Sequence, residues 1–151
     1  TVTGTIRQVA AGSPTAAGSA YWLGSTWRGM APAGASESTG DAGTIYETAY
    51  PGLDVTVERA GTAALRCDGV PVRLADGTPA TVVVIPIDSN GRGRCSSSSD
   101  GSATDVMVVS PSGTAAGAVA YVIARDAVIS LSGRAVTAES AAAIAHALRS
   151  V

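Results

Sequence analysis

The stretch of sequence that decides the fold reads Val70-Pro-Val-Arg-Leu74, then the turn Asp76-Gly-Thr-Pro79, then Thr81-Val-Val-Val-Ile-Pro-Ile87. The last of these segments is the most apolar run of strand-favouring residues in the chain. The only two cysteines, Cys67 and Cys95, stand at the two ends of this stretch. We therefore predict a central β-hairpin that a disulfide closes.

The surroundings of the two cysteines favour a disulfide over free thiols. Both lie in polar, turn-like segments, Arg66-Cys-Asp-Gly69 and Arg94-Cys-Ser-Ser97, whereas unpaired structural cysteines usually lie in apolar ones. A disulfide implies an oxidising compartment, so we expect an extracytoplasmic protein, either secreted or anchored at the cell surface. Two unpaired thiols are the alternative. Two cysteines and one distant histidine lack the ligand spacing of a metal site, and no motif predicts a cofactor.

Composition indicates one globular domain covering residues 1–151. A chain of 151 residues is long enough to bury a core of its own. Its residues are 46% hydrophobic and 15% charged, which excludes general disorder. Phe is absent, so Val, Ala, Ile and Leu must fill most of the core.

The charged residues exclude one class of partner. All ten cationic residues are Arg, they are scattered along the chain, and the net charge is −2. A nucleic-acid-binding protein needs a basic patch or stripe, so we expect no nucleic acid partner. No apolar run reaches the length of about 18 residues that a transmembrane helix requires. The sequence starts at Thr1 without a signal-peptide pattern, and it leaves open an upstream signal peptide or membrane anchor.

Two consecutive segments alternate with the period of a half-buried strand. Every second residue of Leu53-Asp-Val-Thr-Val-Glu-Arg59 is apolar up to Val57, and Thr44-Ile-Tyr-Glu-Thr-Ala-Tyr50 alternates as well. Pro51-Gly52 between them is a turn signal, so the pair is predicted to form a hairpin.

Other segments are assigned from weaker patterns. Val2 to Val9 is predicted as a first strand and Asp105 to Ser110 as a later, buried one. Ala31 to Gly43 is rich in small and polar residues and is predicted to be a mobile loop. Ser96 to Gly101 is predicted to be an exposed loop.

The segment before the C-terminus has two competing interpretations. Ala118 to Ala124 and Ala127 to Ser132 are apolar and flank Arg125-Asp126, which predicts a hairpin with a two-residue turn. Because residues 114–124 are rich in Ala, a helix over that range is the alternative.

The C-terminal segment gives the clearest helix signal. Thr137 is a good N-cap, and the apolar Ala141, Ile144, Ala145 and Leu148 follow helical spacing on one side. We therefore predict an α+β fold, with a mostly antiparallel sheet of short strands and one C-terminal amphipathic helix packed on it.

Four residues are the best candidates for a contact with a ligand or partner. Tyr21, Trp22, Trp27 and Arg28 lie within eight positions and have the composition of a binding hot spot. The alternative is that the aromatic residues belong to a core that has no Phe. No catalytic residue is predicted, and His146 is expected to be exposed on the helix.

Two short segments carry a resemblance to a class of proteins. Tyr21-Trp-Leu-Gly24 and the closing segment from Thr137 to Val151, with Ala147-Leu-Arg149 near its end, resemble secreted or membrane-anchored ectodomains of actinobacteria. The closing pattern is also similar to extracytoplasmic domains of lipoproteins and of sigma-factor regulators. The resemblance implies a lipoprotein-like ectodomain of unknown function.

These observations support three functional hypotheses. The first is a non-enzymatic extracytoplasmic domain that binds or senses a protein, a cell-wall component or a small ligand in the cell envelope. The second is a cell-envelope enzyme whose site is not visible in the sequence. The third is a structural or assembly module whose sheet edge pairs with a strand of a partner.

Overall fold

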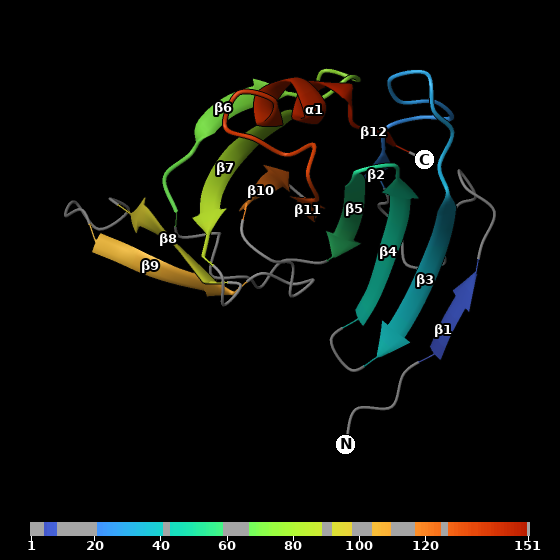
Figure 1. Ribbon diagram of the computed structural model, residues 1–151, viewed down its shortest axis with the longest axis horizontal. Coiled ribbons are helices and arrows are strands. Elements are labelled where there is room, and N and C mark those ends of the chain that lie inside the picture. Colours follow the sequence, from blue (N-terminus) through green and yellow to red (C-terminus); the bar gives the residue numbers. More distant parts are fainter. Residues whose placement is uncertain are drawn as a thin grey trace.

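The computed structural model of the chain is a mostly antiparallel β-structure with one short helix (Figure 1). It describes residues 5–8, 21–40, 43–58, 67–88, 92–97, 104–109, 117–124 and 127–150. This architecture confirms the predicted antiparallel sheet with a helix near the C-terminus. Within the ranges just given, no helix has the length and apolarity to cross a membrane.

Ten of the strands in these ranges form one sheet. They run in the spatial order β1-β3-β4-β5-β11-β10-β7-β8-β9, and β6 pairs with β7 beside this path. A separate pair is formed by β2 (Tyr21–Trp22) and β12 (Arg149–Ser150). The strands of the large sheet are β1 (Thr5–Gln8), β3 (Gly34–Gly40), β4 (Gly43–Tyr50), β5 (Leu53–Glu58), β6 (Val70–Arg73), β7 (Pro79–Ile87), β8 (Arg92–Ser97), β9 (Thr104–Val109), β10 (Gly117–Ala124) and β11 (Val128–Ser132).

Strand β7 is the longest of the described strands and has neighbours along both edges. One edge pairs with β10 from Ala80 to Ile87. The other edge is shared: β6 pairs with its first half, and β8 pairs with it at Ile87 through Gly93. The turn between β6 and β7 contains Gly77 at φ 89°, a conformation that favours glycine. The predicted central hairpin is therefore confirmed.

A disulfide between Cys67 and Cys95 joins the two strands that share this edge. Cys67 precedes β6, Cys95 lies within β8, and their Cα atoms are 5.6 Å apart, a usual separation for a disulfide. Cys67 packs in a cluster with Val83 and Ile85 of β7. The predicted disulfide is confirmed, but the segment after Cys95 was assigned wrongly in part. Residues 96 and 97 continue β8 because they pair with β9, so the loop does not begin at 96.

The predicted hairpin of β4 and β5 is present. Leu53, Val55 and Val57 are buried, and the register pairs Tyr50 with Leu53 across the turn. Gly52 in that turn has φ 78°, and the guanidinium of Arg134 lies over it. The alternation of apolar and polar residues in the sequence therefore corresponds to the alternation of buried and outward-facing side chains on β5.

The loop predicted for Ala31 to Gly43 is wrong over most of its length. Gly34 to Gly40 form β3, which pairs with β4 in a continuous antiparallel register from Gly34 and Ala49 to Gly40 and Gly43. The residues of β3 are small and polar and have no apolar alternation. Pairing with the neighbouring strands β1 and β4 places them in the sheet, because tertiary context outweighs intrinsic strand propensity.

The helix alternative for residues 114–124 is wrong for the part that the structure describes. Residues 117–124 form β10, which pairs with β11 on one side and with β7 on the other. The backbone N–H of Ala124 donates to the carbonyl of Ala127 at 2.9 Å and closes the predicted hairpin. Residues 114–116 lie outside the described ranges.

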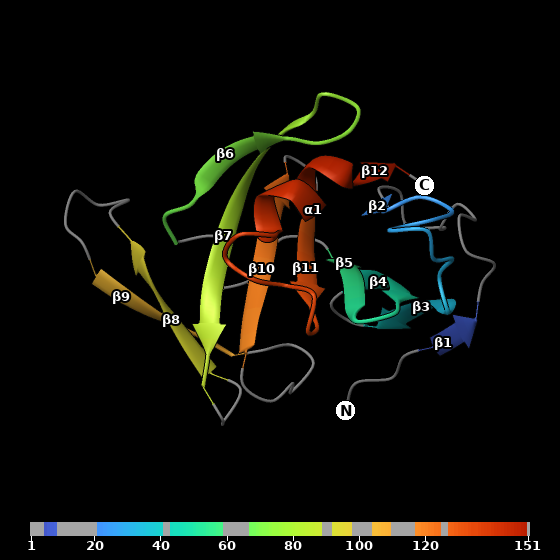
Figure 2. The same ribbon diagram turned by 45° about the horizontal axis from the view of Figure 1, so that its top comes forward.

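Helix α1 (Ala141–Ala147) is shorter than the sequence pattern suggested. A turn precedes it, in which Thr137 and Ser140 exchange hydrogen bonds: Thr137 Oγ1 accepts from the Ser140 N–H at 3.0 Å, and Ser140 Oγ accepts from the Thr137 N–H at 2.9 Å. Ala141, Ile144 and Ala145 are buried in the main core. Figure 2 shows α1 lying across one face of the sheet, in front of β10 and β11.

Some predicted elements are only partly described. Strand β1 covers Thr5 to Gln8 of the predicted first strand, and its remaining residues lie outside the described ranges. Strand β9 matches the later predicted strand, although the burial of its side chains is not described.

The disulfide generates the first prediction. Replacing both cysteines, Cys67→Ser with Cys95→Ser, should lower the free energy of unfolding by roughly 3–4 kcal/mol, because the bridge no longer restricts the unfolded chain. Urea unfolding of the variant and of the oxidised parent measures this difference. Alkylation of the denatured parent, followed by intact mass, is the control: two adducts without reductant would contradict the bridge.

Gly93 generates the second prediction. A Cβ at this position would overlap Ile85 Cγ2 and would stand 2.5 Å from the backbone oxygen of Pro86. Gly93→Ala should therefore lower the free energy of unfolding by about 1–3 kcal/mol. Gly34→Ala is the matched control, because a Cβ on Gly34 meets no atom within 4 Å. Equal unfolding midpoints for the two variants would refute this close approach of β8 to β7.

Candidate functional site

The four candidate contact residues separate into buried and exposed ones. Tyr21 and Trp27 are 5% and 8% exposed and belong to the main core. Trp22 is half-buried in β2, where it pairs with Arg149 of β12, and Arg28 is exposed. The aromatic residues of this segment thus anchor it to the protein, and Arg28 is the member that faces solvent.

Tyr50 at the end of β4 holds this segment in place. Its hydroxyl accepts a hydrogen bond from the Leu23 N–H at 3.0 Å and donates one to the Gly24 carbonyl at 2.8 Å. Its ring meets the Trp27 ring edge-on, with centroids 6.2 Å apart. Burial raises the pKa of the Tyr50 hydroxyl above its ordinary value, and the hydrogen bond from Leu23 partly offsets this. The hydroxyl therefore stays protonated and can act as donor and acceptor at once.

A tight turn, residues 27–30, projects from this anchor and is called the Arg28 turn below. Trp27 and Met30 exchange backbone hydrogen bonds at 2.8 and 3.0 Å, so two residues form the turn. Arg28 and Gly29 both have positive φ, 52° and 76°, as in the type I′ turns of hairpins. Arg28 is the only non-glycine residue with positive φ in the described ranges, and the left-handed conformation costs such a residue roughly 1–2 kcal/mol.

The side chains of the Arg28 turn combine charge with apolar area. The guanidinium carbon of Arg28 lies 4.5 Å from the centre of the Trp27 ring, a cation–π contact. Met30 is 38% exposed and is one of two large apolar side chains that are exposed in the described ranges. An exposed cation and an exposed thioether, held in one turn over a buried aromatic ring, are typical of a contact surface.

Arg149 brings a second guanidinium to the same region. Its guanidinium carbon lies 3.6 Å from the position that a Cβ on Gly24 would occupy, and Gly24 has φ 93°. Gly24 is also the residue whose carbonyl Tyr50 binds. Arg28 and Arg149 therefore contact two parts of one anchored segment.

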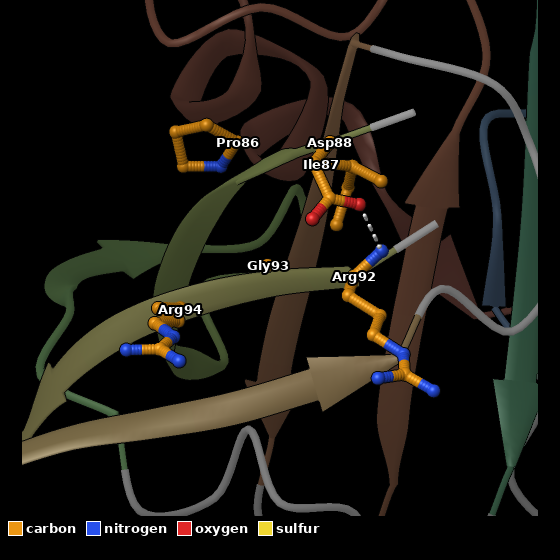
Figure 3. A pocket seen from close by; sticks show the side chains of 6 residues that line it. All are labelled: Pro86, Ile87, Asp88, Arg92, Gly93 and Arg94. Atoms are coloured by element: carbon orange, nitrogen blue, oxygen red, sulfur yellow. Dashed lines mark hydrogen bonds between the residues drawn. The ribbon is translucent and has the colours of Figure 1, made fainter. Parts of the chain in front are cut away.

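A pocket of about 410 Å³ opens at the end of β7, where β8 begins (Figure 3). The backbone closes the turn there: the Asp88 N–H donates to the Arg92 carbonyl at 2.8 Å, and Asp88 Oδ1 accepts from the Arg92 N–H at 3.0 Å. The side chains of Arg92 and Arg94 are exposed. The residues that line the pocket are Pro86, Ile87, Asp88, Arg92, Gly93 and Arg94.

A smaller pocket of about 240 Å³ lies between β3 and β4. Its ionisable lining residue is Glu47, whose carboxylate accepts a hydrogen bond from Thr56 Oγ1 at 3.3 Å. The other lining side chains are small. In the part of the chain that the structure describes, no group of three His, Cys, Asp or Glu side chains gathers as a metal site would require.

His146 is exposed on α1, as expected, and it has a structural contact. Its Nδ1 lies 2.8 Å from the carbonyl oxygen of Arg73 on β6. Because a carbonyl only accepts, Nδ1 must carry the proton. Pro71, also on β6, has no N–H to offer a further strand. These two residues obstruct the outer edge of β6 against strand addition.

Three features of these surfaces were missed by sequence reasoning. Nothing in the sequence indicated Met30 or Arg149 as contact residues, because their surroundings depend on contacts between the segment around residue 24 and the C-terminal segment. Arg92 and Arg94 were visible as the one close pair of arginines, but nothing in the sequence placed a pocket beside them. Comparison with protein families, curated proteins and solved structures finds no match to this chain.

The anchor at Tyr50 generates the third prediction. Tyr50→Phe keeps the ring contact with Trp27 but leaves the buried N–H of Leu23 and carbonyl of Gly24 without their partner. The free energy of unfolding should fall by about 2 kcal/mol, measured by urea unfolding. Tyr50→Leu also loses the ring contact, so the free energy of unfolding of this variant should fall further. A Phe variant as stable as the parent would show that the hydroxyl does not hold this segment.

Proposed function

We propose that this chain is a non-enzymatic binding module of the cell envelope that contacts an anionic cell-wall component through the Arg28 turn. The disulfide supports a position outside the cytoplasm, because such bridges persist in oxidising compartments. The observation that carries the proposal is the strained, exposed Arg28 on a buried aromatic anchor. Non-glycine residues with unfavourable backbone geometry are concentrated at functional sites.

The Arg28 turn is suited to binding because its side chains are already held in place before a partner binds. Trp27 is fixed by Tyr50 and by its own hydrogen bonds to Met30, and the Trp27 ring positions the Arg28 guanidinium. A contact residue that is already held in place loses less side-chain entropy when a partner binds.

The charge of the surface favours an anionic partner. Arg28 and Arg149 both contact this anchored segment, and neither has an ion pair with a described acidic residue. The guanidinium group pairs well with carboxylates and phosphates, and it can form two parallel hydrogen bonds with either. Outside the cytoplasm, the carboxylates of peptidoglycan peptide stems present this chemistry.

The fourth prediction tests the contact. Arg28→Gly removes the guanidinium and suits the positive φ, so the loss of the cation–π contact and the relief of strain nearly offset each other in stability. Co-sedimentation of the variant with insoluble peptidoglycan sacculi at low ionic strength should show about tenfold weaker binding than the parent.

Arg73→Gln is the charge-matched control, because Arg73 is an exposed arginine on β6 whose guanidinium donates to the Gly77 carbonyl at 2.8 Å. It should bind sacculi as the parent does. Absence of sedimentation of the parent, or equal loss of binding in both variants, would contradict the proposal.

A further inference from the structure

The pocket at the end of β7 exists because β8 leaves β7 after a single residue pair. Strand β8 pairs with β7 only at Gly93 and Ile87, yet it pairs with β9 from Arg92 to Ser97. Figures 1 and 2 both show β8 and β9 extending away from the end of β7. The separation of the two strands leaves room between their side chains.

Pro86 explains why the pairing stops. Its carbonyl oxygen lies 2.5 Å from the position of a Cβ on Gly93, so this residue presents its backbone groups toward β8. In a strand the N–H and C=O of one residue point to the same edge. Proline has no N–H, and a hydrogen bond to β8 is therefore missing at this place.

Gly93 determines where the two arginines lie. The side of Gly93 that would carry a Cβ faces Ile85 and Pro86 at less than van der Waals distance, so that side of β8 is packed against β7. Arg92 and Arg94, one position before and after, lie on the opposite side because successive side chains alternate. Both therefore extend from a fixed backbone to the solvent side of the strand.

Figure 3 shows how the two side chains lie. The guanidinium groups of Arg92 and Arg94 point away from one another on either side of Gly93, and Pro86 lies above Arg94. Successive positions on one side of a strand are separated by roughly 7 Å, and divergent side chains increase this separation. Two cations in this arrangement match two anionic groups spaced along a chain better than they match one compact anion.

We propose that this pocket binds a linear acidic polymer of sugar or polyol units, with Arg92 and Arg94 each pairing to an anionic group along its chain. The volume of about 410 Å³ is in the range of pockets for small molecules and accommodates a sugar or polyol unit. The exposed Pro86 ring offers an apolar contact for the carbon skeleton between the two anionic groups. Guanidinium groups supply paired donors for carboxylate or phosphate oxygens.

Among the described residues that line the pocket, Asp88 contributes the one negative charge. Its Oδ1 accepts the N–H of Arg92 within the turn, so one carboxylate oxygen is engaged with the backbone. With two arginines and one aspartate, the described lining residues carry a net positive charge. The site is independent of the proposed function, because it uses β7 and β8 and no residue of the Arg28 turn.

The fifth prediction tests this site by calorimetry and by backbone amide chemical shifts at low ionic strength. Two soluble probes distinguish the source of the anionic groups: oligogalacturonate, which carries carboxylates, and an oligomer of glycerol phosphate, which carries phosphodiesters. At least one should bind with shifts centred on Gly93 and Arg94, and the affinity should fall as salt is added. Inorganic phosphate should bind at least tenfold more weakly.

Substitutions make the test specific. Arg92→Gln and Arg94→Gln should each weaken binding of the oligomer about tenfold. Arg134→Gln removes the same charge from an exposed arginine beside Gly52 and should leave the affinity unchanged. Unfolding midpoints within error of the parent would show that the variants are folded.

Three results would overturn the proposal. The first is no binding of either oligomer, and the second is equal binding of inorganic phosphate, which would mean that spacing is not recognised. The third is equal weakening by Arg134→Gln, which would mean that net charge alone governs binding. None of these results bears on sedimentation with sacculi by the Arg28 turn, so the two proposals fail separately.

Discussion

The structure depends on how the outer edge of β7 is divided between two strands. One edge of β7 is fully paired with β10, whereas the other is paired by β6 at its start and by β8 at its end. Two short partners on one edge have fewer hydrogen bonds than a continuous strand would provide. The disulfide between Cys67 and Cys95 joins the segments that carry these partners, and it packs on Val83 and Ile85 of β7. The covalent bond thus stabilises the place where the backbone pairing is weakest.

The same division accounts for the second arginine surface. Because Pro86 offers no N–H to β8, pairing ends at Gly93, and β8 continues with β9 as its partner. A continuous β7–β8 ladder would bring the strands to their usual spacing and close the pocket. The disulfide ties β8 to the segment that precedes β6, which limits how far β8 can move from β7. Strand pairing, a proline and a covalent bridge together produce a site that no single motif encodes.

The sequence predicted those parts of the fold that depend on neighbouring residues. The alternation of Leu53, Val55 and Val57, the Pro51-Gly52 turn and the apolar run after Pro79 each contain their own signal. Strand β3 was missed because its small polar residues join the sheet only through β1 and β4. The burial of Trp27 was one of two alternatives, and the sequence could not decide it because it depends on Tyr50, which lies 23 positions later and reaches back through its hydroxyl to Leu23 and Gly24. Contacts of this kind have no periodicity to detect.

The use of arginine alone for positive charge fits both proposed surfaces. A lysine at position 28 would keep the charge but would lose the planar stacking on Trp27, and at 92 or 94 it would lose the paired donors. Each surface also fixes its arginine through the backbone, by the positive φ of Arg28 and by the close approach of Gly93 to β7. Figures 1 and 2 show β2 and β8 on different sides of the strands β7, β10 and β11. Because the two surfaces lie apart and share no residue, binding at one of them does not require the other, and each arginine is held by its own local backbone.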